Sequence, residues 1–274
     1  MQSHVVVITG AASGIGQELC RLFARRGAKI GLLDRDQSKL ELLADELREA
    51  GAHCFAAAVD VGQREHVHAA VRRIGSTLGP IDIVIPCAGI CRASTVDDLK
   101  VPELEEIVRT NFLGAVYMIE AVLPSMLERK RGQIVGVSSL AGLRGIPFEP
   151  GYSASKGAVA IYLESLRREL RPRGIRVTTV FPGYVQTPLL DEINVLMGAD
   201  MSNGKASTPA AAAAAILKAI ERGSSHVFFP WSLGLSVRLS RLLPPSLYDL
   251  VMERMFGRLP ISRVPTPVAD SAKS

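Results

Sequence analysis

The chain has 274 residues, 47% hydrophobic and 22% charged, which is enough apolar material for one large core and predicts a single domain. Its net charge is +5, but no RNP, zinc-finger or helix-turn-helix signature accompanies the charge, so we expect no nucleic acid partner. The four cysteines are too sparse for a disulfide framework and lack paired metal-ligand spacing, so we expect reduced, buried thiols and no metal.

The N-terminus bears on where the protein acts. The first expected strand begins at about His4, which leaves no room for a signal peptide. The longest apolar stretches are too short to predict a transmembrane span. We therefore expect a cytoplasmic protein.

Strands and helices alternate along the first half of the chain. Continuous apolar runs, typical of strands buried on both faces, are followed by segments with helical spacing. The expected strands are His4–Thr9, Lys29–Leu33, His53–Val59 and Ile81–Pro86. This alternation predicts an α/β fold, a single doubly wound parallel sheet (Rossmann-like) with helices on both faces.

A glycine-rich turn follows the first strand and opens a helix near Gly14. Positions without side chains let a ligand approach the backbone, and the helix N-terminus directs free N–H groups at a pyrophosphate. Tight strand-to-helix turns favour glycine even without a ligand, but the strand before it and the amphipathic helix after it indicate a dinucleotide site. The expected contacts are Gly10, Ser13, Gly14, Ile15 and Gly16.

Asp34 ends the second expected strand, eighteen residues after Gly16. Its carboxylate could accept both hydroxyls of an adenosine ribose and would repel a 2′-phosphate, which favours NAD. Arg35 could instead bind that phosphate, which keeps NADP as the alternative. Without a cofactor, Asp34 would serve as a helix N-cap.

Tyr152 and Lys156 lie four residues apart and share one face if the segment is a helix. A cation that close stabilises a phenolate and would lower the pKa of Tyr152 from about 10, making it a general acid or base. Ser139 closes the apolar run from Gly132, so its hydroxyl could lie at a strand's carboxyl end beside Tyr152. The same spacing also occurs by chance on solvated helix faces.

Glu103–Glu128 is predicted to form one long helix with Asn111 in an apolar setting. An asparagine inside a helix is mildly unfavourable and requires either a structural hydrogen bond or a water relay. Two later segments, Leu140–Gly151 and Pro188–Ala206, read as loops beside a substrate, the second as a lid with Gly198, Asn203 and Gly204. Neither carries a polar pattern that specifies a substrate.

The sequence also predicts the last strands of the sheet. A strand is expected at Arg176–Phe181, followed by Pro182-Gly183-Tyr-Val-Gln-Thr187. Thr208 caps a helix that begins with Pro209, and a last strand covers His226–Phe229.

Taken in order, these motifs resemble the short-chain dehydrogenase/reductase family from about Val5 to Phe229. The TGxxxGIG motif appears as Thr9, Gly10, Gly14, Ile15 and Gly16, and the Asn-Ser-Tyr-Lys tetrad falls on Asn111, Ser139, Tyr152 and Lys156. The later PG motif with its threonine falls on Pro182, Gly183 and Thr187. Where the family usually has Asn-Ala-Gly, this chain has Cys87-Ala88-Gly89, a departure expected to cost stability or cofactor affinity more than chemistry.

The resemblance implies hydride transfer between NAD(P) and a secondary alcohol or ketone. Tyr152 would exchange the proton, Ser139 would hydrogen-bond the substrate oxygen, and Lys156 would hold the nicotinamide ribose and depress the pKa of Tyr152. Asn111 would support a water that connects Lys156 to solvent. The further cofactor contacts expected by position are Asp60, Val61, Cys87, Ala88, Gly89, Tyr152, Lys156, Pro182, Gly183, Val185 and Thr187. The family's habit of pairing long helices implies a homo-oligomer, a dimer or tetramer.

Two other functions compete with this one. The first is a non-catalytic dinucleotide-binding sensor or scaffold, since fold does not fix function. The second is a sugar-nucleotide epimerase or dehydratase, which carries a separate substrate domain that the chain after Phe229 is too short to form.

Residues 1–230 are expected to form the dinucleotide-binding and catalytic domain, and 231–274 an apolar, basic extension of it. The extension has six basic and three acidic residues. Apolar residues recur at helical spacing in two segments, at Leu235, Leu239, Leu242 and Leu243 and at Leu247, Leu250, Val251 and Met255. Either both helices pack on protein, or they form an entrance on an anionic membrane that admits a steroid, retinoid or long-chain lipid.

Overall fold

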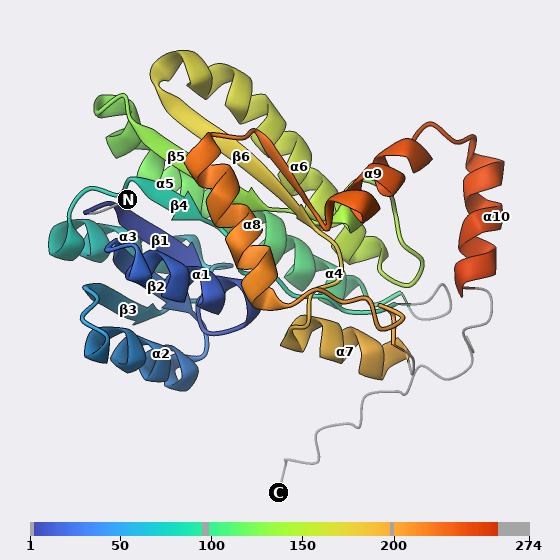
Figure 1. Cartoon of the computed structure of the whole chain (residues 1–274), viewed down its shortest axis with the longest axis horizontal. Coiled ribbons are helices and arrows are strands. Elements are labelled where there is room, and N and C mark those ends of the chain that lie inside the picture. Colours follow the sequence, from blue (N-terminus) through green and yellow to red (C-terminus); the bar gives the residue numbers. More distant parts are fainter. Residues whose placement is uncertain (1–2, 95–98, 198–199, 257–274) are drawn as a thin grey trace, which may run out of the picture.

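A computed structural model describes residues 3–94, 99–197 and 200–256. In this part of the chain, seven strands form one sheet in the order β3-β2-β1-β4-β5-β6-β7, with every neighbouring pair parallel (Figure 1). The strands are β1 (Val5–Thr9), β2 (Lys29–Asp34), β3 (Cys54–Ala58), β4 (Ile83–Ile85), β5 (Gly132–Val137), β6 (Ile175–Pro182) and β7 (His226–Phe229). The predicted doubly wound parallel sheet is confirmed.

Helices cover both faces of the sheet (Figure 1). One layer contains α1 (Gly14–Arg25), α2 (Gln37–Glu49) and α8 (Pro209–Arg222), and the other contains α3 (Arg64–Leu78), α5 (Gly114–Glu128) and α6 (Pro150–Leu170). Side chains alternate between these layers along each strand. In β1, Val6 and Ile8 pack with the first layer, and Val5 and Val7 with the second. The central strands β1, β4 and β5 are buried on both faces, which explains their nearly continuous apolar sequence.

The order of the strands places a crevice above β1 and β4. The chain runs outward from β1 to β2 and β3, then crosses to β4 on the other side of β1. The loops after β1 and β4 thus leave the sheet in opposite directions. In such sheets ligands bind at the carboxyl ends of the strands at this switch point.

The predicted long helix is divided into three parts. These are α4 (Val101–Val108), a π-helical turn (Arg109–Leu113) and α5, and the turn contains Asn111. The whole segment Val101–Glu128 is long and apolar enough to cross a membrane by length and composition, which contradicts our expectation that no stretch was. Met118, Ile119 and Val122 of this segment are buried in the core against the sheet.

Two segments expected to be loops contain helices. The predicted lid holds α7 (Pro188–Met197), while Gly198 lies outside the described residues. The loop before Tyr152 contains a short 3-10 turn (Leu140–Gly142), and α6 already begins at Pro150, so Tyr152 lies in its first turn. A proline at the start of each helix has a preset φ and no N–H to satisfy, which favours this position.

The extension forms α9 (Trp231–Ser240) and α10 (Pro245–Phe256), which project from the sheet beside β7 (Figure 1). A side chain on Gly234 would overlap Phe228, so α9 lies directly on β7. The Tyr248 hydroxyl donates a hydrogen bond to the carbonyl of Gly145 at 2.7 Å, which ties α10 to the loop before α6. These contacts join each helix to its own subunit, and the side chains of Met255 and Phe256 lie outside the described part.

Candidate active site

A cavity of about 500 Å³ opens at the carboxyl ends of the strands. It brings together most of the predicted site residues, namely Gly10, Ser13, Gly14, Ile15, Gly16, Cys87, Ala88, Gly89, Ser139, Tyr152, Lys156, Pro182, Gly183, Val185 and Thr187. Asp34, Arg35, Asp60, Val61 and Asn111 do not line this cavity. Most of them follow β2 and β3, farther along the same edge of the sheet.

The glycine-rich turn fits a dinucleotide. Gly10 has a φ of +66°, which an L side chain rarely adopts, and a Cβ on Gly16 would overlap the carbonyl oxygen of Gly10. Ser13 is the N-cap of α1, yet its side chain makes no capping hydrogen bond, so the N–H groups of the first turn remain available. A pyrophosphate satisfies such groups.

Asp34 is held in place by two backbone hydrogen bonds. The N–H of Ala12 donates to one carboxylate oxygen at 2.9 Å, and the N–H of Asp36 donates to the other at 3.1 Å. The N-cap of α2 is Asp36, which accepts from the N–H of Lys39 at 3.1 Å. The alternative of Asp34 as an N-cap is therefore wrong, and its carboxylate is fixed where β2 ends, with Arg35 exposed beside it.

The two predicted contacts after β3 have different environments. The Asp60 carboxylate accepts from the N–H of Gly62 at 2.9 Å, and Asp60 is exposed. The side chain of Val61 is buried against Gly114. Only the backbone of Val61 remains for a cofactor.

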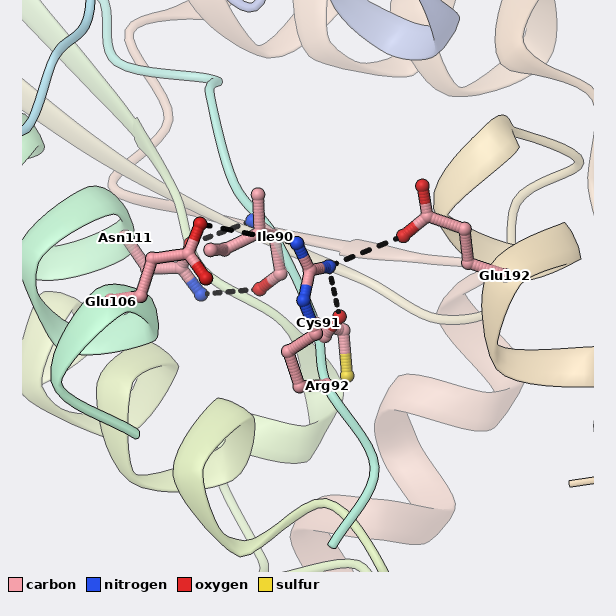
Figure 2. Close-up of polar contacts among 6 residues, drawn as sticks. All are labelled: Ile90, Cys91, Arg92, Glu106, Asn111 and Glu192. Atoms are coloured by element: carbon pink, nitrogen blue, oxygen red, sulfur yellow. Dashed lines mark hydrogen bonds and ion pairs between the residues drawn. The ribbon is translucent and has the colours of Figure 1, made fainter. Parts of the chain in front are cut away.

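Asn111 clamps the chain that follows β4 (Figure 2). Its amide accepts a hydrogen bond from the N–H of Ile90 at 2.8 Å and donates to the carbonyl of Ile90 at 2.9 Å and to Ser155 at 3.0 Å. The π-helical turn re-aims this side chain inward, a frequent use of such turns at functional sites. Of our two explanations for Asn111, the structural hydrogen bond is therefore present.

Gly89 lies between Asn111 and Lys156. A Cβ on Gly89 would lie 3.1 Å from the Lys156 ammonium and 3.3 Å from the Asn111 amide oxygen. The missing side chain leaves this space for the two polar groups.

The backbone at Cys87 is supported by Thr9 rather than by the side chain of residue 87. The Thr9 hydroxyl accepts from the N–H groups of Cys87 at 3.0 Å and Ala88 at 3.1 Å. All four cysteines are unpaired, but only Cys20 and Cys91 are buried. Cys54 and Cys87 are half-buried, against our expectation, because β3 is an edge strand and Cys87 borders the cavity.

Ser139, Tyr152 and Lys156 meet where β5 ends. The Ser139 hydroxyl lies beside the phenol of Tyr152 and donates a hydrogen bond to the carbonyl of Pro182 at 3.4 Å. The Lys156 ammonium donates to the carbonyl of Val137 at 3.0 Å and lies 5.8 Å from the centre of the Tyr152 ring. The geometry thus places one hydroxyl, one phenol and one ammonium at a single end of the cavity.

The pKa of Tyr152 differs from our expectation. Burial raises it above its ordinary value, and the nearby hydroxyl of Ser139 only partly opposes this. Burial also lowers the pKa of Lys156 to about 8. The predicted depression of the Tyr152 pKa by Lys156 is wrong for the protein alone, because removal from water outweighs a cation that is 5.8 Å away from the ring.

Several residues that line the cavity were missed. Arg144 and Glu149, from the loop before α6, line the cavity and were not named as site residues. Glu149 precedes Tyr152 by three residues, a helical spacing that could have revealed it. From the extension, the cavity is lined by Leu233, Ser236, Val237, Ser240, Leu243, Tyr248, Val251 and Met252.

Arg92 connects the predicted lid to α4 (Figure 2). Its guanidinium lies 3.4 Å from Glu192 of α7 and 3.9 Å from Glu106 of α4. Beneath α7, Ile193 packs with Cys91. Charged and apolar contacts therefore hold α7 beside the cavity, which its residues Leu189, Leu190 and Ile193 line.

Comparisons with known proteins agree with this geometry. The family model described as short chain dehydrogenase matches residues 4–196. An uncharacterized oxidoreductase of Myxococcus xanthus is 36% identical over 255 residues, covering 93% of this chain and 98% of its own. Dehydrogenase/reductase SDR family member 7B of Xenopus laevis is 33% identical over 265 residues, covering 92% and 81%.

A solved structure shares the fold. It is a short chain dehydrogenase/reductase from Burkholderia phymatum in complex with NAD, with a TM-score of 0.81 and 24% sequence identity. The match covers 98% of each chain. Within the described residues, the match therefore extends beyond β7 to α9 and α10.

Proposed function

The chain belongs to the short-chain dehydrogenase/reductase family, and from that premise we propose that it transfers a hydride between NAD(P) and a secondary alcohol or ketone of a hydrophobic small molecule. It is an NAD(P)-dependent dehydrogenase/reductase. One observation carries the substrate proposal: Ser139, Tyr152 and Lys156 share a cavity whose other walls, from α7, α9 and α10, are mostly apolar. Such a cavity favours an apolar substrate body with one polar reacting group.

Residues of the chain itself carry out the proton transfer. The bound dinucleotide supplies or accepts the hydride. Tyr152 exchanges a proton with the substrate oxygen, and the Ser139 hydroxyl donates a hydrogen bond to the charge that develops there. Because burial opposes ionisation of Tyr152, the nearby hydroxyl of Ser139 and the ammonium of Lys156 are needed to offset it.

A screen that follows the absorbance of the reduced cofactor tests this proposal. The panel contains steroids, retinoids, long-chain keto and hydroxy lipids and small alcohols, each with NAD and with NADP. We expect turnover of the long apolar compounds. Cofactor binding without turnover of any compound would favour the non-catalytic sensor, and preference for small polar alcohols would overturn the hydrophobic substrate.

We propose NAD as the preferred cofactor because the Asp34 carboxylate is fixed at the end of β2. Asp34→Ala is expected to lower the ratio of NAD to NADP activity at least about tenfold, since it removes both the ribose acceptor and the repulsion of a 2′-phosphate. Arg35 is then free to pair with that phosphate. The ratio of kcat/KM values for the two cofactors measures the effect.

Asp36→Ala is the matched control for Asp34. It removes a neighbouring carboxylate that caps α2, so it costs helix stability but should leave the cofactor ratio unchanged. A wild-type protein that already prefers NADP at equal concentration would show that Arg35 outweighs Asp34.

We further propose that the protein is cytoplasmic and that the outer face of its extension lies on an anionic membrane. Trp231 on α9 is 72% exposed, and Leu242 between α9 and α10 is 80% exposed. Further exposed apolar residues on the two helices are Leu235, Leu239, Leu247 and Leu250. The exposed Arg241 and Arg254 belong to the same segment of the sequence. Apolar residues with interspersed cations suit an anionic lipid surface, and the inner faces of the same helices line the cavity.

Vesicle binding tests the membrane proposal. Wild-type protein is expected to co-sediment with vesicles of phosphatidylserine and phosphatidylcholine, and the bound fraction should fall as salt is added. A double variant with Leu239→Glu and Leu242→Glu should lose binding, while Leu42→Glu, a change at an equally exposed leucine on α2, should retain it. Wild-type protein that ignores vesicles at low salt, or a double variant that instead dissociates an oligomer, would overturn the proposal.

A further inference from the structure

Glu149 is a buried carboxylate on the cavity wall. It is only 4% exposed and lies at the N-cap position of α6, one residue before the helix begins. Its side chain makes no capping hydrogen bond. The carboxylate is therefore not used to begin the helix.

Glu149 also has no charged partner. Within the described residues, the structure records neither an ion pair nor a hydrogen bond for its side chain, and burial alone raises its pKa, to about 7. Burying a carboxylate without a partner is costly. Since the cavity is the open space beside this group, a ligand there is the natural source of a donor.

The surroundings of Glu149 differ from those of Arg144, the other polar residue of this loop on the cavity wall. The titratable groups that face it are Tyr152 from α6, Tyr184 from the segment after β6 and Cys91 from the segment after β4. Tyr152 and Tyr184 pack with the apolar cluster beneath α7. Arg144, the other newly found polar residue, instead lies with its guanidinium 3.9 Å from the centre of the Tyr248 ring, beside α10.

We propose that Glu149 is a specificity-determining residue that accepts a hydrogen bond from a hydroxyl or amino group which the substrate carries apart from its reacting carbon. This inference rests on the proposed oxidoreductase function and narrows it. The preferred substrate is an apolar ketone or alcohol with a second, hydrogen-bond-donating group. A fully apolar substrate would leave the carboxylate unsatisfied, and an enzyme site built to bond a polar group discriminates strongly against an analogue that lacks it.

Matched substrates test the inference. The probes are methyl octyl ketone and its derivatives with one hydroxyl or one amino group at successive positions along the octyl chain. Wild-type protein is expected to prefer at least one derivative over the parent by about tenfold or more in kcat/KM, mainly through KM. Glu149→Leu should abolish this preference, and Glu149→Gln, which keeps an acceptor, should retain part of it for the hydroxyl probe.

The pH dependence separates the two donors. As Glu149 ionises from about pH 6 to about pH 8, the preference for the amino probe should grow more than that for the hydroxyl probe. Glu164→Gln, on the same helix but exposed, is the matched control and should change neither preference. An unchanged preference in Glu149→Leu, or no preferred derivative in wild-type protein, would overturn the inference.

A binding measurement keeps this test independent of turnover. If no ketone is reduced, the proposed function fails, and calorimetric binding of octylamine then decides the role of Glu149. Weaker binding by Glu149→Leu than by wild-type protein above about pH 7 supports the buried acceptor. Equal binding by the two proteins refutes it.

Discussion

Turnover by Tyr152→Phe is expected to fall by at least about two orders of magnitude at saturating cofactor, while cofactor binding stays nearly intact. The substitution removes only the phenol oxygen, which lies beside the Ser139 hydroxyl, and keeps the ring that packs beneath α7. Single-turnover and steady-state rates on the best substrate of the screen measure the loss, and a fluorescence titration measures cofactor affinity.

Tyr184→Phe provides the matched control. Tyr184 lines the same cavity, and burial raises its pKa to about 12, but its hydroxyl has no assigned part in proton exchange. Its removal should affect turnover far less than removal of the Tyr152 hydroxyl. Near-normal turnover by Tyr152→Phe would refute the acid/base assignment.

Lys156→Met is expected to damage two properties together. It should lower turnover by about two orders of magnitude, because the cation that favours ionisation of Tyr152 is lost, and weaken cofactor binding by about tenfold, because the ribose loses a donor. The protein should still fold, since methionine replaces a fully enclosed ammonium, whose pKa burial lowers to about 8, with a side chain of similar length.

Cofactor affinity and turnover must therefore be measured on the same Lys156→Met preparation. Lys39→Met removes an exposed lysine of α2 that pairs with Asp36 and should leave both quantities close to wild type. An effect of Lys156→Met on turnover alone would contradict the contact with the ribose.

The parts of the site that could be predicted are those set by local sequence. The turn at Gly10 and Gly16 is required by backbone geometry alone, and Tyr152 and Lys156 share a helix face wherever that helix lies. The family motifs added the position of Asn111. The same local character explains why the predicted fold class was confirmed, because each strand and helix carries its own periodicity.

The features that the sequence did not predict depend on contacts between segments that are far apart in the chain. The π-helical turn at Asn111 has no sequence period of its own, and the pKa of Tyr152 depends on burial by segments far along the chain. The sequence analysis did not single out Glu149, because its burial near Tyr184 and Cys91 depends on segments far along the chain. The sequence also did not reveal which residues of α9 and α10 line the cavity, because apolar spacing does not indicate which side of a helix faces a cavity.

The attachment of α10 has an evolutionary consequence. Its Tyr248 contacts the loop before α6 through one hydroxyl and one ring face, whereas Tyr152 and Lys156 belong to a helix packed on the sheet. Mutations in α10 can therefore change the shape of the cavity with little loss of folding stability and without disturbing proton exchange at Tyr152. Homologous proteins are therefore expected to differ in substrate specificity through substitutions in this C-terminal helix, while the catalysed reaction stays the same.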